Sequence, residues 1–485
     1  MDTNRTSISP DALAARFLRC ADFMTRRIDA GLDPTRPVTI CWLDGLVDGQ
    51  NLARTLLEPL TEFWRLSADP ADFLERLRGG AVTAWALTET ESLGEAADAL
   101  THGSCVLIPP EPRSALCFEL RAAVGRSVGE PTLEKSVKGG REAFVETLRV
   151  NTALLRRRLA TPELKLLESS IGHRSKTKVA LLYLEGVADE SLVAALCRKL
   201  DALDLDALLA PGPLEEALAD APRSPFPQLL HTERPDRMAM HLADGRVGLL
   251  ADGLPLGLIL PVTLAEFLKT GSERSQHYLV GSALNLLRWA ALLLALLLPG
   301  LYAALALYHQ EMIPTKLLLS LIEAKQKVPF TTALELLGMM LSFLMLQEAG
   351  LRLPGPMGDT VSIIGALIVG QAAVEARLVS PIAIIVVAAA GIACYTLPSQ
   401  DLAAALRLWS IGLLLAGALA GLYGVALGSC LLLWHLAGID SFGRSYTAPL
   451  SEDGPGLRRL LLRRPQAAIK LRDALLRPLD RRKRR

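Results

Sequence analysis

Hydrophobic positions divide the sequence into two regions of different character. As far as residue 278, short apolar runs alternate with polar stretches, whereas residues 279–439 carry long apolar runs with few charges. The first pattern is typical of strands and amphipathic helices, and the second is typical of helices that cross a bilayer. We therefore predict an α/β region followed by an α-helical membrane domain with several spans.

The α/β region contains an internal repeat. Val38–Asp48 (VTICWLDGLVD) and Val179–Asp189 (VALLYLEGVAD) read alike, and a helical pattern follows each of them. Further on, Gly103–Leu120 and Gly245–Val262 both read as strand, turn and strand, which predicts a β-hairpin. The two matches are offset by 141 and 142 residues. The repeat predicts two similar α/β subdomains.

An acidic residue followed by glycine ends the first of these strands in each copy, at Asp44–Gly45 and Glu185–Gly186. Two facing carboxylates would suit acid–base catalysis, but a strand-to-helix turn explains the same residues, with Asp48 or Asp189 capping the helix. We favour the turn because the sequence has no phosphate-binding, nucleophile or metal-binding motif. Its seven cysteines are scattered and are interpreted as small buried apolar residues. We expect no enzymatic activity, no cofactor and no metal site.

Long apolar segments in the second region are candidate membrane spans. They are Trp289–Tyr308, Val379–Pro398 and Leu408–Leu436. The third has 29 residues, more than one span needs, and predicts either a strongly tilted helix or a break near Gly421–Gly428. Its glycines follow the small-residue spacing that lets helices approach closely. Two weaker segments, 331–346 and 360–374, carry polar residues and are typical of re-entrant or discontinuous helices.

Charged and amide side chains within the membrane domain are costly to bury, so they are candidates for function. We single out as pore or gating residues Glu335, Glu348, Gln371, Glu375 and Arg377. Arg352 and Arg407 belong to the same class of intramembrane charges. The alternative is that these side chains pair with one another, or lie at the membrane surface, for structural reasons.

Two groups of charged residues in the α/β region are candidates for contact between subunits. They are Arg156, Arg157 and Arg158, and Arg234 with Asp236. The first group ends a predicted helical linker, where a solvated helix end with a favourable helix dipole is the alternative. The second lies in 222–236, whose four prolines predict an extended connector rather than a helix or a central strand.

The formal charge of +1 is a cancellation between unlike regions. Residues 1–278 carry a net −7, residues 279–439 a net 0 and residues 440–485 a net +8. The basic tail predicts a cytoplasmic C-terminus that attracts anionic membrane lipid, and nothing in the composition indicates nucleic-acid binding. No export signal precedes the α/β region, which is therefore expected on the same side, with an even number of crossings; four is our prediction.

The predicted organisation has six parts. They are an N-terminal extension (1–35), a first α/β subdomain (36–135), a helical linker (136–174), a second α/β subdomain (175–278), a transmembrane domain (279–439) and a basic cytoplasmic tail (440–485).

Several stretches of the sequence resemble one known family. The similarity to the A-subunit family of spore germination receptors (the GerA family) rests on SKTKVALLYLEGVAD (175–189), SPFPQ (224–228), TERPD (232–236), HQEMIPTKLLLSL (309–321) and QEAGLRLPGPMGDTVSIIGALIVGQAAVEARLVSPIAIIVVA (347–388). The resemblance covers residues 140–450 well, while the first subdomain matches more loosely through LDGLVD. The family usually has glycine at the position of Arg377, so this residue departs from its pattern.

The resemblance implies a subunit of a nutrient-sensing complex in the inner membrane of bacterial spores. It implies two partners, a permease-like B subunit and a lipoprotein C subunit, and a homo-oligomer whose membrane part releases ions when germinant binds. Related A-type proteins of the stage V sporulation group act as auxiliary channels. A non-conducting assembly scaffold and a secondary transporter are the alternatives that stay open.

Overall fold

The chain folds into two units, which we treat separately. The computed structural model describes residues 8–28, 37–67, 70–79, 86–109, 114–122, 129–131, 134, 139–352, 370–449 and 460–483. The first unit comprises Met1–Ala219, Leu229–Val262 and Ala467–Arg485, and we call it the α/β unit. The second comprises Asp220–Gln228 and Thr263–Gln466, and we call it the helical unit.

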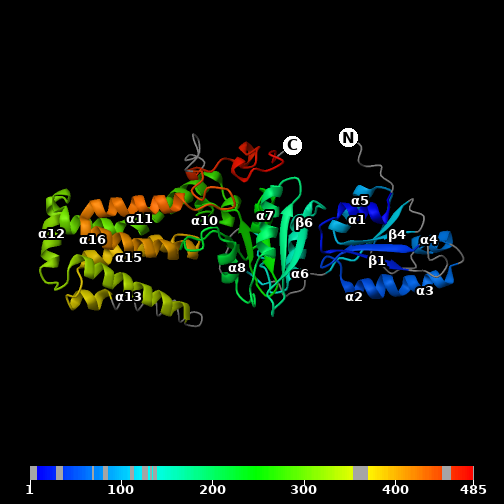
Figure 1. The fold of residues 1–485 in the computed structure, drawn as a ribbon, viewed down its shortest axis with the longest axis horizontal. Coiled ribbons are helices and arrows are strands. Elements are labelled where there is room, and N and C mark those ends of the chain that lie inside the picture. The colour runs from blue at the N-terminus through cyan, green and yellow to red at the C-terminus, as the bar shows by residue number, and fades with distance from the viewer. Residues whose placement is uncertain are drawn as a thin grey trace. The chain divides into compact units, whose positions relative to one another are not determined.

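The α/β unit contains two sheets with helices between their strands (Figure 1). The first subdomain consists of α1 (Pro10–Arg16), β1 (Phe23–Ile28), β2 (Val38–Leu43), α2 (Gly49–Asn51), a π-helical turn (Leu52–Leu57), α3 (Glu58–Leu66), α4 (Pro70–Arg78), β3 (Leu87–Thr90), α5 (Leu93–Thr101), β4 (Ser104–Ile108) and β5 (Ala115–Glu119). The second consists of α6 (Leu148–Arg158), β6 (Leu164–Ile171), β7 (Thr177–Leu184), α7 (Glu190–Asp201), α8 (Pro211–Leu218), β8 (Leu230–Thr232), α9 (Pro235–Ala243), β9 (Val247–Ala251) and β10 (Gly257–Leu260).

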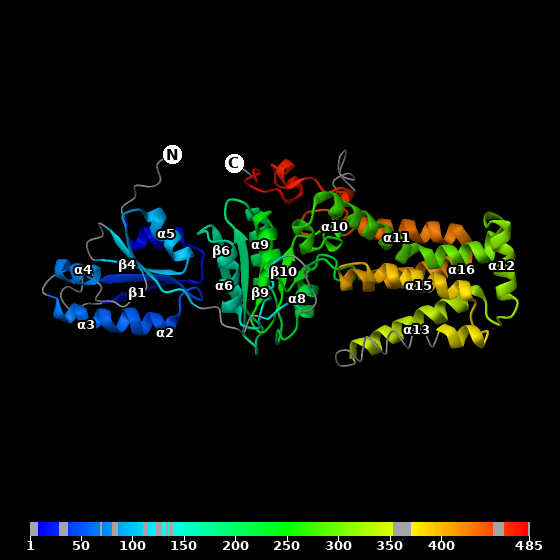
Figure 2. The ribbon, with the colours of Figure 1, turned by 180° about the vertical axis from the view of Figure 1, so that it is seen from behind.

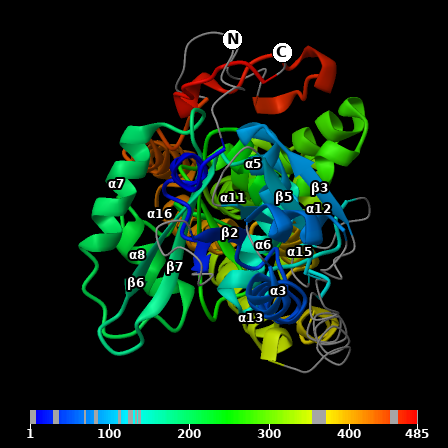
Figure 3. The same cartoon turned by 90° about the vertical axis from the view of Figure 1, so that its right-hand side faces the viewer.

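The two sheets have the same topology. Each has five strands, in the order β1-β2-β4-β5-β3 and β6-β7-β9-β10-β8, and neighbouring strands are antiparallel throughout. The predicted hairpins are β4–β5 and β9–β10. In the second subdomain α7 contacts β6, beside which it runs in the end view of Figure 3. The repeat seen in the sequence is therefore confirmed as a structural duplication.

The strands are apolar at consecutive positions because both faces of the first sheet are covered. In β4, Val106 and Ile108 belong to the core cluster shared with α1 and α5, whereas Cys105 and Leu107 belong to the cluster shared with α3 and α4. Successive strand residues point to opposite faces, so a sheet covered on both sides needs apolar residues at every position. This is why a continuous apolar run, and not an alternating one, marks these strands.

The turn that follows β2 recurs after β7. Gly45 and Gly186 have φ values of +88° and +75°, which favour glycine because it has no Cβ atom. Asp48 then accepts a hydrogen bond from the Gln50 backbone N–H at 2.9 Å, and Asp189 caps α7 in the same way. The interpretation of the acid–glycine pairs as capped turns is confirmed.

Two strands lie outside the predicted subdomain bounds. β1 falls within residues 1–35, and β6 falls within 136–174. Both are edge strands, and β1 (FMTRRI) is mostly exposed, so neither carries the apolar pattern of a central strand. β6 also bonds to the first subdomain, because the Ala21 backbone N–H donates to the Leu166 carbonyl at 3.0 Å.

The proline-rich connector, residues 222–236, contains strand β8 and the first residues of helix α9. β8 is an edge strand paired only with β10 among the described residues, and α9 begins at Pro235, where a helix tolerates proline. The expectation of no central strand is met, but the helix was not expected to begin before residue 236.

The helical unit is built from long apolar helices (Figure 2). It contains α10 (Leu264–Phe267), α11 (Tyr278–Tyr308), α12 (Thr315–Lys325), α13 (Thr332–Arg352), α15 (Pro381–Tyr395) and α16 (Gln400–Ala437). Among the described residues, α11, α13 and α16 are long and apolar enough to cross a membrane, and α15 is a shorter apolar helix. Of the predicted segment 360–374, only 370–374 lies among the described residues.

α16 reverses direction at Gly421. This residue has φ +61° and ψ −146°, which are not helical angles. The rings of Trp409 and His435 lie 5.7 Å apart, whereas 26 residues of continuous helix would separate them by about 39 Å. A Cβ atom on Gly424 would clash with the Ala416 carbonyl oxygen. The predicted break in this segment is confirmed, and its glycines allow the two arms to approach closely.

Candidate functional site

Glu335 lies in the first turn of α13 and is buried in the apolar helical unit. Its side chain is 3% exposed. One carboxylate oxygen accepts hydrogen bonds from the Ser380 backbone N–H at 3.2 Å and from the Ser380 hydroxyl at 2.9 Å. Ser380 is the N-cap of α15, so the carboxylate lies at the positive end of a helix dipole. The other oxygen of Glu335 has no hydrogen-bond partner among the residues that the structure describes.

A second polar atom at the start of α13 is also unpartnered among the described residues. Thr332, the first residue of α13, is 1% exposed, and its hydroxyl has no partner among them. Buried polar groups are usually satisfied, because leaving one unpaired costs about 1–3 kcal/mol. The start of α13 therefore offers an anionic oxygen and a hydroxyl to a bound proton, water or cation.

The structure does not bring the other predicted gating residues to Glu335. Glu348 is exposed near the end of α13, and Gln371 and Glu375 are exposed on the short helical stretch 370–375. Arg377 is exposed as well, with φ +55°, and lines a groove of about 390 Å³ together with Glu323 and Lys327 of the α12 region. The role of these four residues in the pore or its gating stays a prediction.

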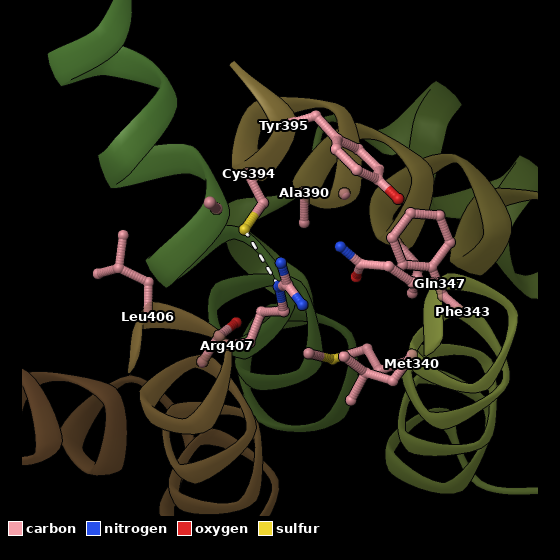
Figure 4. Close-up of a pocket in the computed structure, with 13 residues that line it drawn as sticks. Met340, Phe343, Gln347, Ala390, Cys394, Tyr395, Leu406 and Arg407 are labelled. Carbon is pink, nitrogen blue, oxygen red and sulfur yellow. Dashed lines mark hydrogen bonds between the residues drawn. The ribbon is translucent and has the colours of Figure 1, made fainter. Parts of the chain in front are cut away.

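A pocket lies between four helices of the helical unit (Figure 4). It has a volume of about 40 Å³, and α11, α13, α15 and α16 all contribute to its walls. The walls are mostly apolar, with residues such as Met340, Phe343 and Ala390. Its lining also includes the polar side chains of Arg407, Ser410, Gln347 and Tyr395.

Arg407 projects from α16 into this pocket. Its Nε–H donates to the Cys394 sulfur at 3.5 Å, and it forms no ion pair with any described residue. Figure 4 shows its guanidinium and the Gln347 amide on opposite sides of the open space. The Ser410 hydroxyl and Gln347 Oε1 are both buried, and neither has a hydrogen-bond partner in the described part of the chain.

The sequence identifies Arg407 as an intramembrane charge, but it does not point to Gln347 and Ser410 as its neighbours in the pocket. Gln347 and Ser410 escaped because single amides and hydroxyls are common in apolar helices. One signal was available in the spacing: Arg407 and Ser410 are three residues apart, as are Leu344 and Gln347, which puts each pair on one helix face.

The predicted interface residues of the α/β unit all make contacts within the chain. Arg156 forms an ion pair with Asp22, and Arg158 forms one with Glu142 at 2.6 Å. Arg157 donates to the Ala122 carbonyl at 2.7 Å. Their use in contact between subunits stays a prediction.

The Arg156–Asp22 pair joins the two subdomains. Nε donates to Oδ2 at 2.7 Å and Nη2 donates to Oδ1 at 2.9 Å, and both side chains are 1% exposed. Burial by itself would lower the pKa of Arg156, but the charge and hydrogen bonds of Asp22 outweigh it and raise that pKa. The pair is a closed contact that holds the first subdomain against α6.

Arg234 and Asp236 also pair with each other. Their side chains are joined by bonds of 3.0 and 2.6 Å at the start of α9. Burial tends to raise the pKa of Asp236, yet the hydrogen bond and charge of Arg234 prevail, so that pKa is lowered. Asp236 lies in the first helical turn, where a negative charge is favourable.

Other predicted features can be placed among the described residues. Five of the seven free cysteines are buried, while Cys197 is partly buried and Cys430 is exposed. Burial raises the pKa of the Cys105 thiol well above its usual range. Within the described parts of the chain, no three His, Cys, Asp or Glu side chains gather in a way that would hold a metal ion.

A duplicated α/β unit followed by apolar helices with buried polar side chains defines a class of membrane protein. Within that class, the family described as Bacillus/Clostridium GerA spore germination protein matches residues 11–475. The chain belongs to this family, and the resemblance noted in its sequence is confirmed.

Several relatives match nearly the whole chain. It is 33% identical to spore germination protein B1 of Bacillus subtilis (strain 168) over 92% of each chain. It is 31% identical to spore germination protein GerLA of Bacillus cereus, over 99% of this chain and 95% of that one. It is 35% identical to the uncharacterized membrane protein YfkQ of Bacillus subtilis (strain 168), over 89% and 83% respectively.

One solved structure is also similar. It is the N-terminal domain of the A subunit of the Bacillus megaterium spore germinant receptor GerK3, at 27% identity and a TM-score of 0.42, over 53% of this chain and 98% of that one.

Proposed function

We propose that this chain is the membrane subunit of a spore germinant receptor that, as part of an oligomer, releases ions when a nutrient is sensed. Family membership supports a role in germination, because its relatives are named spore germination proteins. In this proposal the chain lies in the spore inner membrane with its α/β unit and tail in the cytoplasm. Its partners are further copies of itself, a permease-like B subunit and a lipoprotein C subunit.

The burial of Glu335 is the observation that carries the proposal. A carboxylate that is 3% exposed in an apolar helical unit is costly, and it has no ion-pair partner among the described residues. Rings of acidic side chains are a common means of selecting cations in channels. In a closed oligomer, one Glu335 from each copy would form such a ring if the start of α13 faced the central axis.

The helices around Glu335 are suited to a change of state. Among the described residues, the carboxylate accepts hydrogen bonds from the cap of α15 alone, so a shift of α15 relative to α13 would change these bonds without unfolding either helix. Binding of nutrient to a partner subunit would act by favouring one of the two arrangements. Glu348, Gln371, Glu375 and Arg377 are the predicted continuation of the path, and their exposure in the single chain is compatible with contact to a neighbouring copy.

The test is cation release from spores that carry Glu335→Gln. Neutralising this side chain should slow nutrient-triggered release by about tenfold, equivalent to roughly 1.4 kcal/mol on the barrier. Glu311→Gln is the matched control, because Glu311 is an exposed glutamate of the same unit. Receptor abundance must be equal in the three strains.

The alternatives predict different results. Single-channel recording on the purified oligomer should show a conductance that Glu335→Gln reduces, and its absence would favour the non-conducting scaffold. Solute uptake by the isolated protein in liposomes would favour a secondary transporter, whose broken helices are of the kind found in α16. Unaltered release in Glu335→Gln spores would mean that the pore lies elsewhere.

A further inference from the structure

Arg407 is a permanent positive charge that lacks a counter-charge. The guanidinium group is always protonated in proteins, and α16 is one of the helices long and apolar enough to cross a membrane. None of the 13 residues that line the pocket is acidic, and Arg407 has no ion pair with any described residue. A charge in this position is costly unless an opposite charge comes close to it.

The pocket walls supply further hydrogen-bond groups directed at the same space. Ser410 is 2% exposed, and its hydroxyl has no partner among the described residues. The Gln347 amide faces Arg407 across the pocket, and its Oε1 atom is likewise unpartnered among them. The oxygen and nitrogen of an amide are interchangeable by a rotation, so Gln347 can present its NH₂ group instead. The pocket walls thus carry one guanidinium, one hydroxyl and one amide that can each donate a hydrogen bond.

We propose that this pocket binds a small monovalent anion, which serves as the counter-ion of Arg407 and links α13 with α16. The volume of about 40 Å³ holds roughly three waters, or one halide-sized ion with a water. The chemistry is the same for chloride and for a carboxylate of very few atoms, such as formate. Larger organic anions do not fit. This inference stands independently of the proposed pore.

Water alone does not fulfil the same role. Waters would satisfy the Ser410 hydroxyl and the Gln347 amide, but they bring no charge to oppose Arg407. The Arg407 Nε–H bond to the neutral Cys394 sulfur is a weak one and likewise brings no charge. An anion in the pocket can accept hydrogen bonds from its walls and also removes the cost of the unpaired guanidinium.

The experiment uses the full-length protein in a neutral detergent. Chloride binding is followed by the broadening of its NMR line during a titration at constant ionic strength, with gluconate as the replacing anion. The unfolding temperature is measured under the same conditions. We expect saturable broadening, competition by formate but not by gluconate, and an unfolding temperature that rises with chloride over the same range.

Variants assign the binding to the pocket. Arg407→Gln should abolish both responses, whereas Lys316→Gln, which removes an exposed positive charge from α12, should leave both unchanged. If Arg407→Gln does not fold, Ser410→Ala carries the test, because loss of one hydrogen bond should weaken chloride binding about three- to tenfold. The proposal is overturned if the wild-type protein shows no saturable response, if the folded variants respond as the wild type does, or if gluconate competes.

Discussion

The α/β unit and the helical unit differ in how far their inward-facing charges are paired. In the α/β unit, Arg156 and Asp22 are each 1% exposed and are joined by two short hydrogen bonds. In the helical unit, Arg288 and Glu273 form an ion pair, but neither the buried Glu335 nor the half-buried Arg407 forms one with a described residue. The helical unit therefore leaves two charges without an ion pair among the described residues.

This difference indicates what each unit is built to do. A closed buried pair adds little net stability compared with apolar residues, but it is strongly destabilising when broken, so it enforces one arrangement of the elements it joins. An open buried charge stabilises nothing by itself and gains its counterpart from something that binds. We therefore infer that the buried pair fixes one arrangement of the α/β unit, and that the two unpaired charges of the helical unit mark where the proposed ions would bind.

Breaking the closed pair should have the largest effect. Asp22→Asn leaves Arg156 buried without a counter-charge and should lower the free energy of unfolding by about 3–5 kcal/mol. The contact between the subdomains should loosen first, so hydrogen exchange in the full-length protein should speed up at the backbone N–H groups of Ala21 and Leu166. Asp11→Asn is the control, because Asp11 is exposed on α1 of the same subdomain. Equal exchange in the two variants would contradict a role for the pair in holding the subdomains together.

A counter-charge for Arg407 within the chain should raise the free energy of unfolding, by less than the loss of the Arg156–Asp22 pair lowers it. Ser410→Asp places a carboxylate three residues from Arg407 on the same helix face, where the two side chains can pair. In the absence of chloride it should stabilise the protein by about 1.5–3 kcal/mol, the usual strength of a hydrogen bond to a charged group, and it should remove the response to chloride. Ser410→Asn is the control, because the asparagine side chain is similar in size to aspartate but carries no charge. If the two variants show the same chloride response, the pocket does not lack a negative charge.

The α/β unit follows from the sequence more completely than the helical unit does. Central strands such as β2 and β7 carry continuous apolar runs and end in a glycine turn with a capping aspartate, and these local signals predict the repeat directly. The edge strand β1 was not predicted, because its four central residues are exposed and it has little apolar character. The partnership of Arg156 with Asp22 could not be predicted, because it joins residues 134 positions apart through tertiary packing.

In the helical unit the sequence locates spans and unusual charges but not their neighbours. The length of the third apolar segment predicted either a strong tilt or a break near Gly421–Gly428, and the reversal at Gly421 follows from its backbone angles. The predicted set of gating residues is dispersed, since Glu335 is buried while Gln371 and Glu375 are exposed. Helices of nearly uniform hydrophobicity carry little information about which face meets which neighbour, so pockets such as the one around Arg407 emerge only from the packing.

The smallest effect is expected where a charge pair is only partly buried. The pKa of Asp236 is lowered in the folded chain by Arg234, with a further contribution from Arg158, so the ionised carboxylate stabilises the fold above the pKa of the unfolded chain. That contribution should disappear as the pH falls below about 4 and through the lowered folded pKa. Asp236→Asn should therefore be less stable than the wild type near neutral pH, by less than about 1 kcal/mol because solvent screens the pair, and should lose that difference in acid. The measurement is the unfolding temperature of both proteins across this range. A difference in unfolding temperature that does not change with pH would show that Asp236 acts through its shape and hydrogen bonds and not through its charge.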